Sequence, residues 1–386
     1  MEVTQIYEFV NNATKEFLGE EQLLKEDLSN IVDVGTAIFN AGAVDNYVRT
    51  LVDHIGKVVF VDRVYKSGAP DVLMDGWEYG SVCEKISGVI PEAEESEDWE
   101  LQDGASYDQQ IFYKPTIEVK FFNGKKVFTI PSSFTQKQVK SSFSNAGQMN
   151  GFLSMLRGNI AKSMTVKVDA LIYATIRNFI AQTIYSETQG ASISGRSGIK
   201  AVNLLYLYNQ RFGKSLTAAE MYTDKDFDRF ATYQMGLYSD RMQIMSSLYN
   251  ISGKARFTPK DMQHIVLLSE FARGAEVYLQ SDTFHNDLTR LPKYESVPMW
   301  QGSGTSNDET GKVYCTIEDE SGNKHDVTVT GVIGVIFDRD ALGVSNLEEQ
   351  VRTAYNAKGD FYNNYYAFES HYFNDFNENF VVFYGA

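Results

Sequence analysis

Hydrophobic and polar residues alternate in two short runs near position 120, a pattern that predicts two β-strands. The runs cover residues 119–122 and 127–130, and Asn123-Gly124 lies between them. An Asn-Gly pair readily adopts the positive φ angles of a type I′ turn, so the sequence predicts a two-stranded hairpin. Pro131 cannot donate a hydrogen bond to a strand ladder, and we expect it to end the second strand.

After this predicted hairpin the hydrophobic period becomes helical. A first apolar face spans residues 149–160, and after a break the pattern resumes over residues 168–184. The second face consists of Val168, Leu171, Ile172, Ile176, Phe179, Ile180 and Ile184. At the helical rise per residue, residues 163–187 alone would form a rod of roughly 37 Å. The sequence therefore predicts one very long amphipathic helical region.

The first hundred residues combine short periodic segments with a long irregular stretch. Residues 6–17 and 44–55 each carry one apolar helical stripe, and residues 58–65 have the period of a strand. The next segment, 66–110, is a long polar excursion that includes an acidic run at residues 92–100. Four of its apolar residues are spaced too sparsely to fill a core alone, and we expect them to contact a neighbouring subunit. They are Trp77, Tyr79, Val82 and Ile86.

The second half mixes short helices and strands around a candidate linker at residues 189–195. Residues 201–212 suit one helix, and a second helix is expected to begin at Thr223, with Asp226 in capping-box spacing. The remaining expected elements are a strand at 265–268 followed by a helix, a hairpin at 313–318 and 326–329, and strands at 332–337 and 380–384, with an aromatic-rich stretch at 361–376 between these two. This order predicts an α+β fold in which strands distant in sequence pair.

Composition and charge narrow the possible functions. The 386-residue chain has 43% hydrophobic residues, which is enough to bury two or more cores. Its formal net charge of -16 argues against a surface that grips nucleic acid tightly. Cys83 and Cys315 are the only cysteines, so a disulfide framework is not expected. We find no targeting signal and no apolar run of the ~18 residues that a membrane helix needs, and we expect a chain that is cytosolic when synthesised.

Catalytic motifs were sought among the same residues. Gly213-Lys214-Ser215 lacks the earlier glycine of a phosphate-binding loop, and we expect a surface loop there. Asp224, Asp226 and Asp228 have the first spacing of a calcium loop, but Arg229 replaces the required glycine, so they are interpreted as carboxylates at a helix start. The five histidines show no metal-ligand spacing, and no Gly-x-Ser-x-Gly occurs. We therefore assign no catalytic, cofactor-binding or metal-ligating residue.

Three amino-terminal segments carry a family resemblance. Residues 34–38, 45–48 and 51–59 resemble the amino-terminal region of phi-29-like podovirus major capsid proteins. The resemblance implies the Hong Kong-97-type (HK97-like) capsid fold. By this resemblance the chain divides into an N-terminal arm with helices (1–56), an extended E-loop region (57–112), a P-domain hairpin and spine helix (113–190), an A-domain (191–330) and a return to the P-domain (331–386).

The implied function is a major capsid protein that forms hexamers and pentamers of an icosahedral or elongated phage head. The resemblance also implies portal and scaffolding partners, weak contact with packaged double-stranded DNA, no membrane, and a virion assembled in the host cytoplasm. An encapsulin-like compartment is an alternative within the same fold. From a different class, the alternative is a hydrolase or binding protein whose site is assembled from scattered residues.

The founding member of this fold is known for a lysine-to-asparagine cross-link between subunits. Lys66 and Lys85 lie in the matching region of this chain, but no motif fixes an asparagine partner, and the reaction also needs a buried carboxylate as base. We expect the shell to be held by non-covalent burial instead.

Overall fold

The computed structural model describes residues 67–74, 83–91, 93, 95, 102–105, 110, 112–135, 146–280, 293–301, 311–319, 321–359 and 361–386. The elements predicted at residues 6–17, 44–55 and 58–65 lie outside these residues, as do Trp77, Tyr79 and Val82. The chain divides into two compact units. One comprises Met1–Tyr65, Ile130–Ser163 and Val351–Tyr366, and the other Lys66–Thr129, Met164–Gln350 and Ala367–Ala386.

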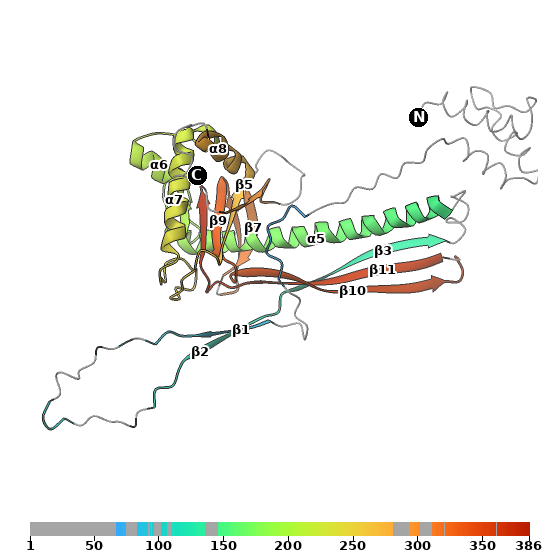
Figure 1. Cartoon of the computed structure of the whole chain (residues 1–386), viewed down its shortest axis with the longest axis horizontal. Helices are drawn as coiled ribbons and strands as arrows, with labels where there is room; N and C mark the ends of the chain where they lie inside the picture. Colours follow the sequence, from blue (N-terminus) through green and yellow to red (C-terminus); the bar gives the residue numbers. More distant parts are fainter. Residues whose placement is uncertain are drawn as a thin grey trace, which may run out of the picture. The chain divides into compact units, whose positions relative to one another are not determined.

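A five-stranded mixed sheet forms the centre of the second unit (Figure 1). Its order is β4 (Ala201–Asn203), β12 (Phe380–Tyr384), β9 (Val332–Asp338), β5 (Gln263–Leu268) and β6 (Glu295–Val297). The three inner strands are antiparallel, and each outer strand runs parallel to its neighbour. The predicted mixture of helices and strands, with pairing between strands distant in sequence, is confirmed.

Helices cover both faces of this sheet. On one face, α6 (Leu204–Phe212), α7 (Lys225–Arg241) and α8 (Ser269–Gln280) enclose a core that includes Val381 and Phe383 of β12. Alternate residues of a strand point to opposite faces. Phe380 accordingly stacks on Phe179 of the long helix α5 (Ala146–Thr188), with ring centroids 4.1 Å apart. The sheet is therefore buried on both sides.

The long helix predicted from the sequence is confirmed, but it has no break. α5 is continuous over 43 residues, and the seven apolar positions predicted between residues 168 and 184 are all buried. The stretch 161–167 that interrupts the apolar stripe is partly or fully exposed, although it remains helical. The helix can continue through this interruption because backbone hydrogen bonding does not depend on an apolar stripe. The interruption of the stripe therefore marks a stretch that is less buried, and not the end of the helix.

Local signals explain where the shorter helices begin and end. Asn203 accepts a hydrogen bond from the Tyr206 backbone N–H at the start of α6, and Gly213 ends that helix with a φ of 62°. The predicted start of α7 at Thr223 is wrong by one residue. Asp224 is the N-cap, and its Oδ1 accepts from the backbone N–H groups of Asp226 and Phe227 at 2.9 and 2.8 Å. The following strand at 265–268 and its helix are confirmed as β5 and α8.

The hairpin predicted around Asn123-Gly124 is wrong, although its two strands exist. β2 (Ile117–Phe122) pairs with β1 (Cys83–Gly88), whereas β3 (Lys125–Thr135) joins a sheet with β11 (Phe361–Asn374) and β10 (Leu342–Asn356). Gly124 is not among the positive-φ residues. It permits a close approach instead, because a Cβ there would lie 2.6 Å from the Tyr372 carbonyl oxygen. Pro131 lies inside β3, which tolerates it as an edge strand.

The second predicted hairpin is confirmed. β7 (Val313–Glu318) pairs antiparallel with β8 (Lys324–Val329). The Asp319 carboxylate caps the turn by accepting hydrogen bonds from the backbone N–H groups of Ser321 and Asn323 at 2.9 and 2.8 Å. Together with the His325 side chain, these donors lower the pKa of Asp319 to about 2, with the His325 contact as the largest cause.

The first unit contains the start of α5, the ends of β3 and β10, and the start of β11. Ser133 of β3 donates a hydrogen bond to Asn363 of β11 at 2.5 Å, and Thr353 of β10 donates to Asn364 at 2.9 Å. Side-chain bonds of this kind add to the strand ladder. Within the described part of the chain, no helix is long and apolar enough to cross a membrane.

Candidate interaction site: the β1–β2 ribbon

The antiparallel ribbon formed by β1 and β2 has two chemically different faces. Ile86 lies opposite Val119, and Lys85 lies opposite Lys120, so each pair occupies one face. The face that we call the outer face carries Ile86, Ile117, Val119 and Phe121, with Glu84 and Gly88. The inner face carries Cys83, Lys85, Ser87, Glu118, Lys120 and Phe122. Every inner-face residue is partly buried, whereas every outer-face residue is exposed.

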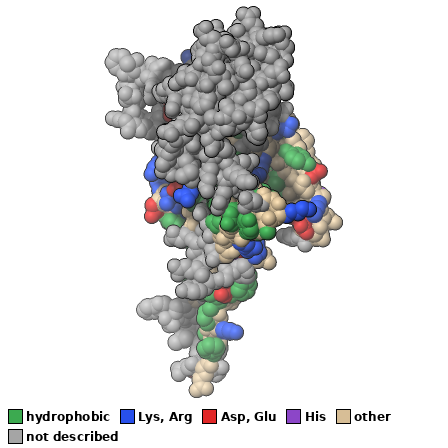
Figure 2. Space-filling model, turned by 90° about the vertical axis from the view of Figure 1, so that its right-hand side faces the viewer, with side chains coloured by type: hydrophobic (Ala, Val, Ile, Leu, Met, Phe, Trp, Pro, Cys, Tyr) green, Lys and Arg blue, Asp and Glu red, His purple; other side chains and the backbone are tan. Residues whose placement is uncertain are grey.

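The outer face exposes large apolar side chains. Ile86, Ile117 and Phe121 are 62%, 60% and 65% exposed, and Val119 is 45% exposed. Phe112 and Tyr113, just before β2, are exposed as well. Hydrophobic side chains are visible along the ribbon in the lower part of Figure 2. The burial pattern is thus the reverse of an ordinary amphipathic strand, in which the apolar face is covered.

The inner face contacts the turn between β11 and β12, residues 375–379, through charged side chains. Lys85 Nζ lies 2.8 Å from Asp375 Oδ2 and 2.9 Å from Glu378 Oε1. Lys120 Nζ lies 3.1 Å from the other oxygen of the same carboxylate, Asp375 Oδ1. Nearer the tip of the ribbon, Glu118 pairs with Lys254. We call Lys85, Lys120, Asp375 and Glu378, with the Glu118–Lys254 pair, the ionic base.

Of the four predicted contact residues, Ile86 is described and lies on the outer face. Trp77, Tyr79 and Val82 lie outside the described residues, so their contacts stay a prediction. The strand predicted at residues 119–122 contains two of the outer-face residues, Val119 and Phe121. Assigning that strand to a hairpin with residues 127–130 concealed the exposure of this face.

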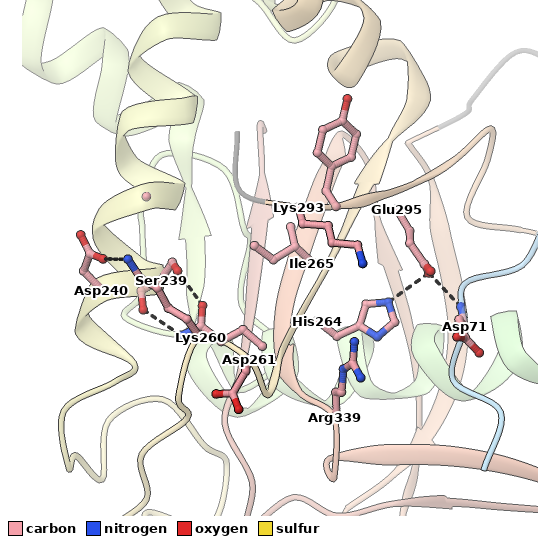
Figure 3. Close-up of a pocket in the computed structure, with 13 residues that line it drawn as sticks. Asp71, Ser239, Asp240, Lys260, Asp261, His264, Ile265, Lys293, Glu295 and Arg339 are labelled. Atoms are coloured by element: carbon pink, nitrogen blue, oxygen red, sulfur yellow. Dashed lines mark hydrogen bonds and ion pairs between the residues drawn. The ribbon is translucent and has the colours of Figure 1, made fainter. Parts of the chain in front are cut away.

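A pocket of about 730 Å³ lies at the amino-terminal ends of β5 and β6 and is a second candidate site (Figure 3). His264, Lys293, Glu295 and Arg339 contribute side chains to it (Figure 3). His264 Nε2 lies 3.0 Å from Glu295 Oε2, which also accepts a hydrogen bond from the Asp71 backbone N–H at 2.8 Å. These contacts connect residues 67–74 to the edge strand β6.

The comparison with protein families decides the identity of the chain. A family model described as Phi29-like phage major capsid protein matches residues 8–384. The chain belongs to this family. The major capsid function that the amino-terminal resemblance implied is therefore confirmed, and the protein is part of a virion whose head shell it forms by self-assembly.

Solved structures show the same fold. A capsid chain of Staphylococcus phage Andhra matches the capsid protein with a TM-score of 0.53 at 12% identity, covering 86% of this chain and 87% of that chain. A chain from the structure of the head fiber and inner core protein of native bacteriophage P68 matches with a TM-score of 0.50 at 9% identity, covering 86% and 88%. Identities this low show the fold alone. No curated protein matches the chain.

Within this capsid protein the pocket of Figure 3 does not present the contacts of a hydrolase site. Nε2 of His264 is used by Glu295, and its ring stacks on Phe337 with centroids 5.0 Å apart. The nearby Ser239 hydroxyl donates to Gln263 at 2.6 Å. In the described part of the chain, no serine or cysteine is hydrogen-bonded to His264. The pocket residues instead connect the sheet edge to neighbouring segments.

The sequence interpretation did not predict that one acidic residue of the capsid protein, Asp228, is buried. Asp228 lies in the first turn of α7, as expected of a helix-start carboxylate, but its side chain is 0% exposed and neither carboxylate oxygen has a hydrogen-bond partner. Burial, and next the charge of Asp224, raise the pKa of Asp228 to about 7. Spacing could not have revealed this, since the cover comes from α8, where Gly274 approaches the carboxylate.

Proposed function

We propose that the outer face of the β1–β2 ribbon docks on a second copy of the chain within hexamers and pentamers of an icosahedral or elongated head. The supporting observation is the exposure of Ile86, Ile117, Val119 and Phe121 on one face of a ribbon whose polar face is turned inward. A contiguous apolar strip of this kind indicates a surface that is covered in the working state. In a self-assembling shell protein, the available cover is another subunit.

The expected strength of such a contact follows from the apolar area. Complete burial of a valine, isoleucine or phenylalanine side chain contributes about 1.5–3 kcal/mol. Because the four outer-face residues are roughly half exposed in the single chain, each would gain about 1 kcal/mol on docking. A few kcal/mol per contact is modest. However, every subunit in a closed shell both gives and receives one contact, so a small change in the energy of each contact has a large effect on assembly of the whole shell.

We further propose the HK97-like correspondence of parts. In this proposal β1 belongs to the E-loop region (57–112), and β2, which falls in the range 113–190, completes the ribbon of that loop. α5 is the spine helix of the P-domain (113–190 and 331–386). Helices α6–α8 and strands β4, β5 and β6 belong to the A-domain (191–330), and β9 and β12 join their sheet from the return segment 331–386. Residues 1–56 would form the N-terminal arm. Trp77, Tyr79 and Val82 lie in the same E-loop region as Ile86, and we assign them to the same contact with a neighbouring subunit.

Portal and scaffolding proteins are the proposed partners during assembly in the host cytoplasm. The formal net charge of -16 supports only weak contact with packaged double-stranded DNA, because a shell wall that bound phosphate strongly would release many counterions and hold the genome.

The test replaces the apolar outer face while leaving the inner face intact. We expect the double substitution Val119→Thr and Phe121→Ser to leave a folded subunit but to weaken each docking contact by about 2 kcal/mol, or roughly 30-fold. Shell yield would be measured by sedimentation and electron microscopy, and folding by circular dichroism. Tyr314→Ser, an exposed aromatic residue of β7, is the matched control. Normal shells from the double variant would refute the docking role.

A further inference from the structure

The ionic base contains two neighbouring lysines that would repel each other without the Asp375 carboxylate. Lys85 and Lys120 are directly opposite each other on adjacent strands, and like charges in that position repel. The Asp375 carboxylate lies between them and gives one oxygen to each ammonium, at 2.8 and 3.1 Å. Its side chain is only 2% exposed. One buried carboxylate therefore holds both strands of the ribbon at the same point.

Further contacts saturate Lys85. Its Nζ also lies 2.9 Å from Glu378 Oε1 and donates to the Asp340 carbonyl oxygen at 3.2 Å, so three acceptors surround the three ammonium protons. Glu378 is itself 3.7 Å from Arg256 Nε. Because the three acceptors belong to three different residues, together they fix the position of the Lys85 ammonium group.

The Glu118–Lys254 pair has the opposite polarity. Along the inner face of β2, Lys120 faces the carboxylate of Asp375, whereas Glu118, two residues away, faces the ammonium of Lys254. Phe122, at the other end of this face, contacts the Phe373 ring with centroids 5.0 Å apart. A slip of the ribbon by one residue, or a roll by half a turn, would place apolar side chains against Asp375 and leave a buried charge without a partner.

We propose that the ionic base positions the ribbon, with Asp375 as the central positioning residue, so that only the apolar outer face is offered to a second copy of the chain. This inference rests on the proposed docking function and deepens it. The ion pairs keep the apolar outer face from packing against its own subunit. If it packed there, it could not contact a second copy during assembly. The base acts through orientation and makes no contact with the partner.

The charges of Asp375 and Lys85 persist over a wide pH range. Burial alone would raise the pKa of Asp375, but the hydrogen bond and charge of Lys85 outweigh it and lower that pKa below 3.8. For Lys85, burial lowers the pKa, and the contacts with Asp375 and Glu378 raise it above 10.5. The stabilisation from Asp375 is lost only as the pH falls below its ordinary value, and that from Lys85 only as the pH rises above 10.5.

A charge exchange at the more exposed pair tests the proposal without disturbing the buried carboxylate. We expect Lys254→Glu to place two carboxylates together and raise the protein concentration needed for assembly by roughly tenfold. The double variant Glu118→Lys with Lys254→Glu restores opposite charges and is expected to return assembly to within about twofold of the original. Lys260→Glu, which affects the exposed Lys260–Asp240 pair, is the matched control and is expected to assemble normally.

A second readout reports orientation directly in the unassembled chain. A carbodiimide condenses a carboxylate and an amine that are in ion-pair contact into an amide, with loss of water. We expect a Glu118–Lys254 link by mass spectrometry in the original chain, none in Lys254→Glu, and a link again in the double variant. Assembly that is weak in both Lys254→Glu and the double variant, or a missing link in the original chain, would overturn the proposal. Normal assembly of Lys254→Glu would overturn it too, while loss of assembly in Val119→Thr with Phe121→Ser would still support ribbon docking.

Discussion

The β1–β2 ribbon and the five-stranded sheet use the same backbone geometry with opposite burial. In the sheet, β9 and β12 are apolar on both faces, and every residue of both strands is buried between helices. In the ribbon, the apolar face is exposed and the charged face lies against the turn at residues 375–379. Alternation along a strand thus identifies two faces, but the neighbouring surface decides which of them is covered.

The largest expected effect lies in the covered region. Ile176 of α5 is 0% exposed, and replacing it with aspartate would bury an unpaired carboxylate at a cost of about 3–5 kcal/mol. We expect Ile176→Asp to abolish soluble subunit, measured as yield and thermal unfolding. Val166→Asp, on the same helix at a side chain that is 49% exposed, is the control and is expected to remain soluble. If both variants behaved alike, α5 would not be covered as described.

The buried carboxylates Asp375, at the ribbon, and Asp228, in α7, also differ in their surroundings. Asp375 at the base of the ribbon has two lysine partners and a lowered pKa, whereas Asp228 in the body has no partner and a pKa of about 7. An acid whose folded pKa lies above its ordinary value of 3.8 destabilises the fold as it ionises. The free energy of unfolding is therefore expected to fall as the pH rises from about 4 to about 7, and to stay reduced above that.

The variant Asp228→Asn removes this ionisation. We expect it to be more stable than the original chain by about 2–4 kcal/mol at pH 8, where the aspartate is charged, and to differ little near pH 4. Urea unfolding at several pH values measures both effects. Asp226→Asn, one half-turn earlier on α7 and exposed, is the control and is expected to leave the pH dependence unchanged. An unchanged slope in Asp228→Asn would contradict the assignment.

The sequence predicted the covered region better than the exposed one. The elements β5, β7, β8, β9 and β12 were all predicted, because their apolar runs and turn residues are local signals. Pairing between distant strands was expected in general, but the sequence did not show which strands pair, since the ladder that joins β3 to β11 depends on residues far along the chain. Hairpin signals report only local preference, and tertiary packing overrode it at Asn123-Gly124.

The ionic base was beyond the reach of sequence patterns for the same reason. Lys120 and Asp375 are separated by 255 positions, and nothing in the spacing of either residue points to the other. Lys85 had been considered for a covalent cross-link, but it lies in an intrasubunit ion pair with Asp375 and Glu378. The exposure of Ile86 was anticipated from the scarcity of apolar neighbours, a local property of residues 66–110.

The smallest expected effect lies where the chain leaves the ribbon. Gly124 joins β2 to β3, accepts a hydrogen bond from the Tyr372 backbone N–H at 3.0 Å, and has no room for a Cβ beside the Tyr372 carbonyl. We expect Gly124→Ala to cost about 1–3 kcal/mol, measured by thermal unfolding, because backbone atoms must shift to accept the methyl group. Gly88→Ala, at the far end of β1 with nothing within 4 Å of the added Cβ, is expected to cost nothing measurable. Equal stability of the two variants would show that the step from ribbon to sheet is not held by this close contact.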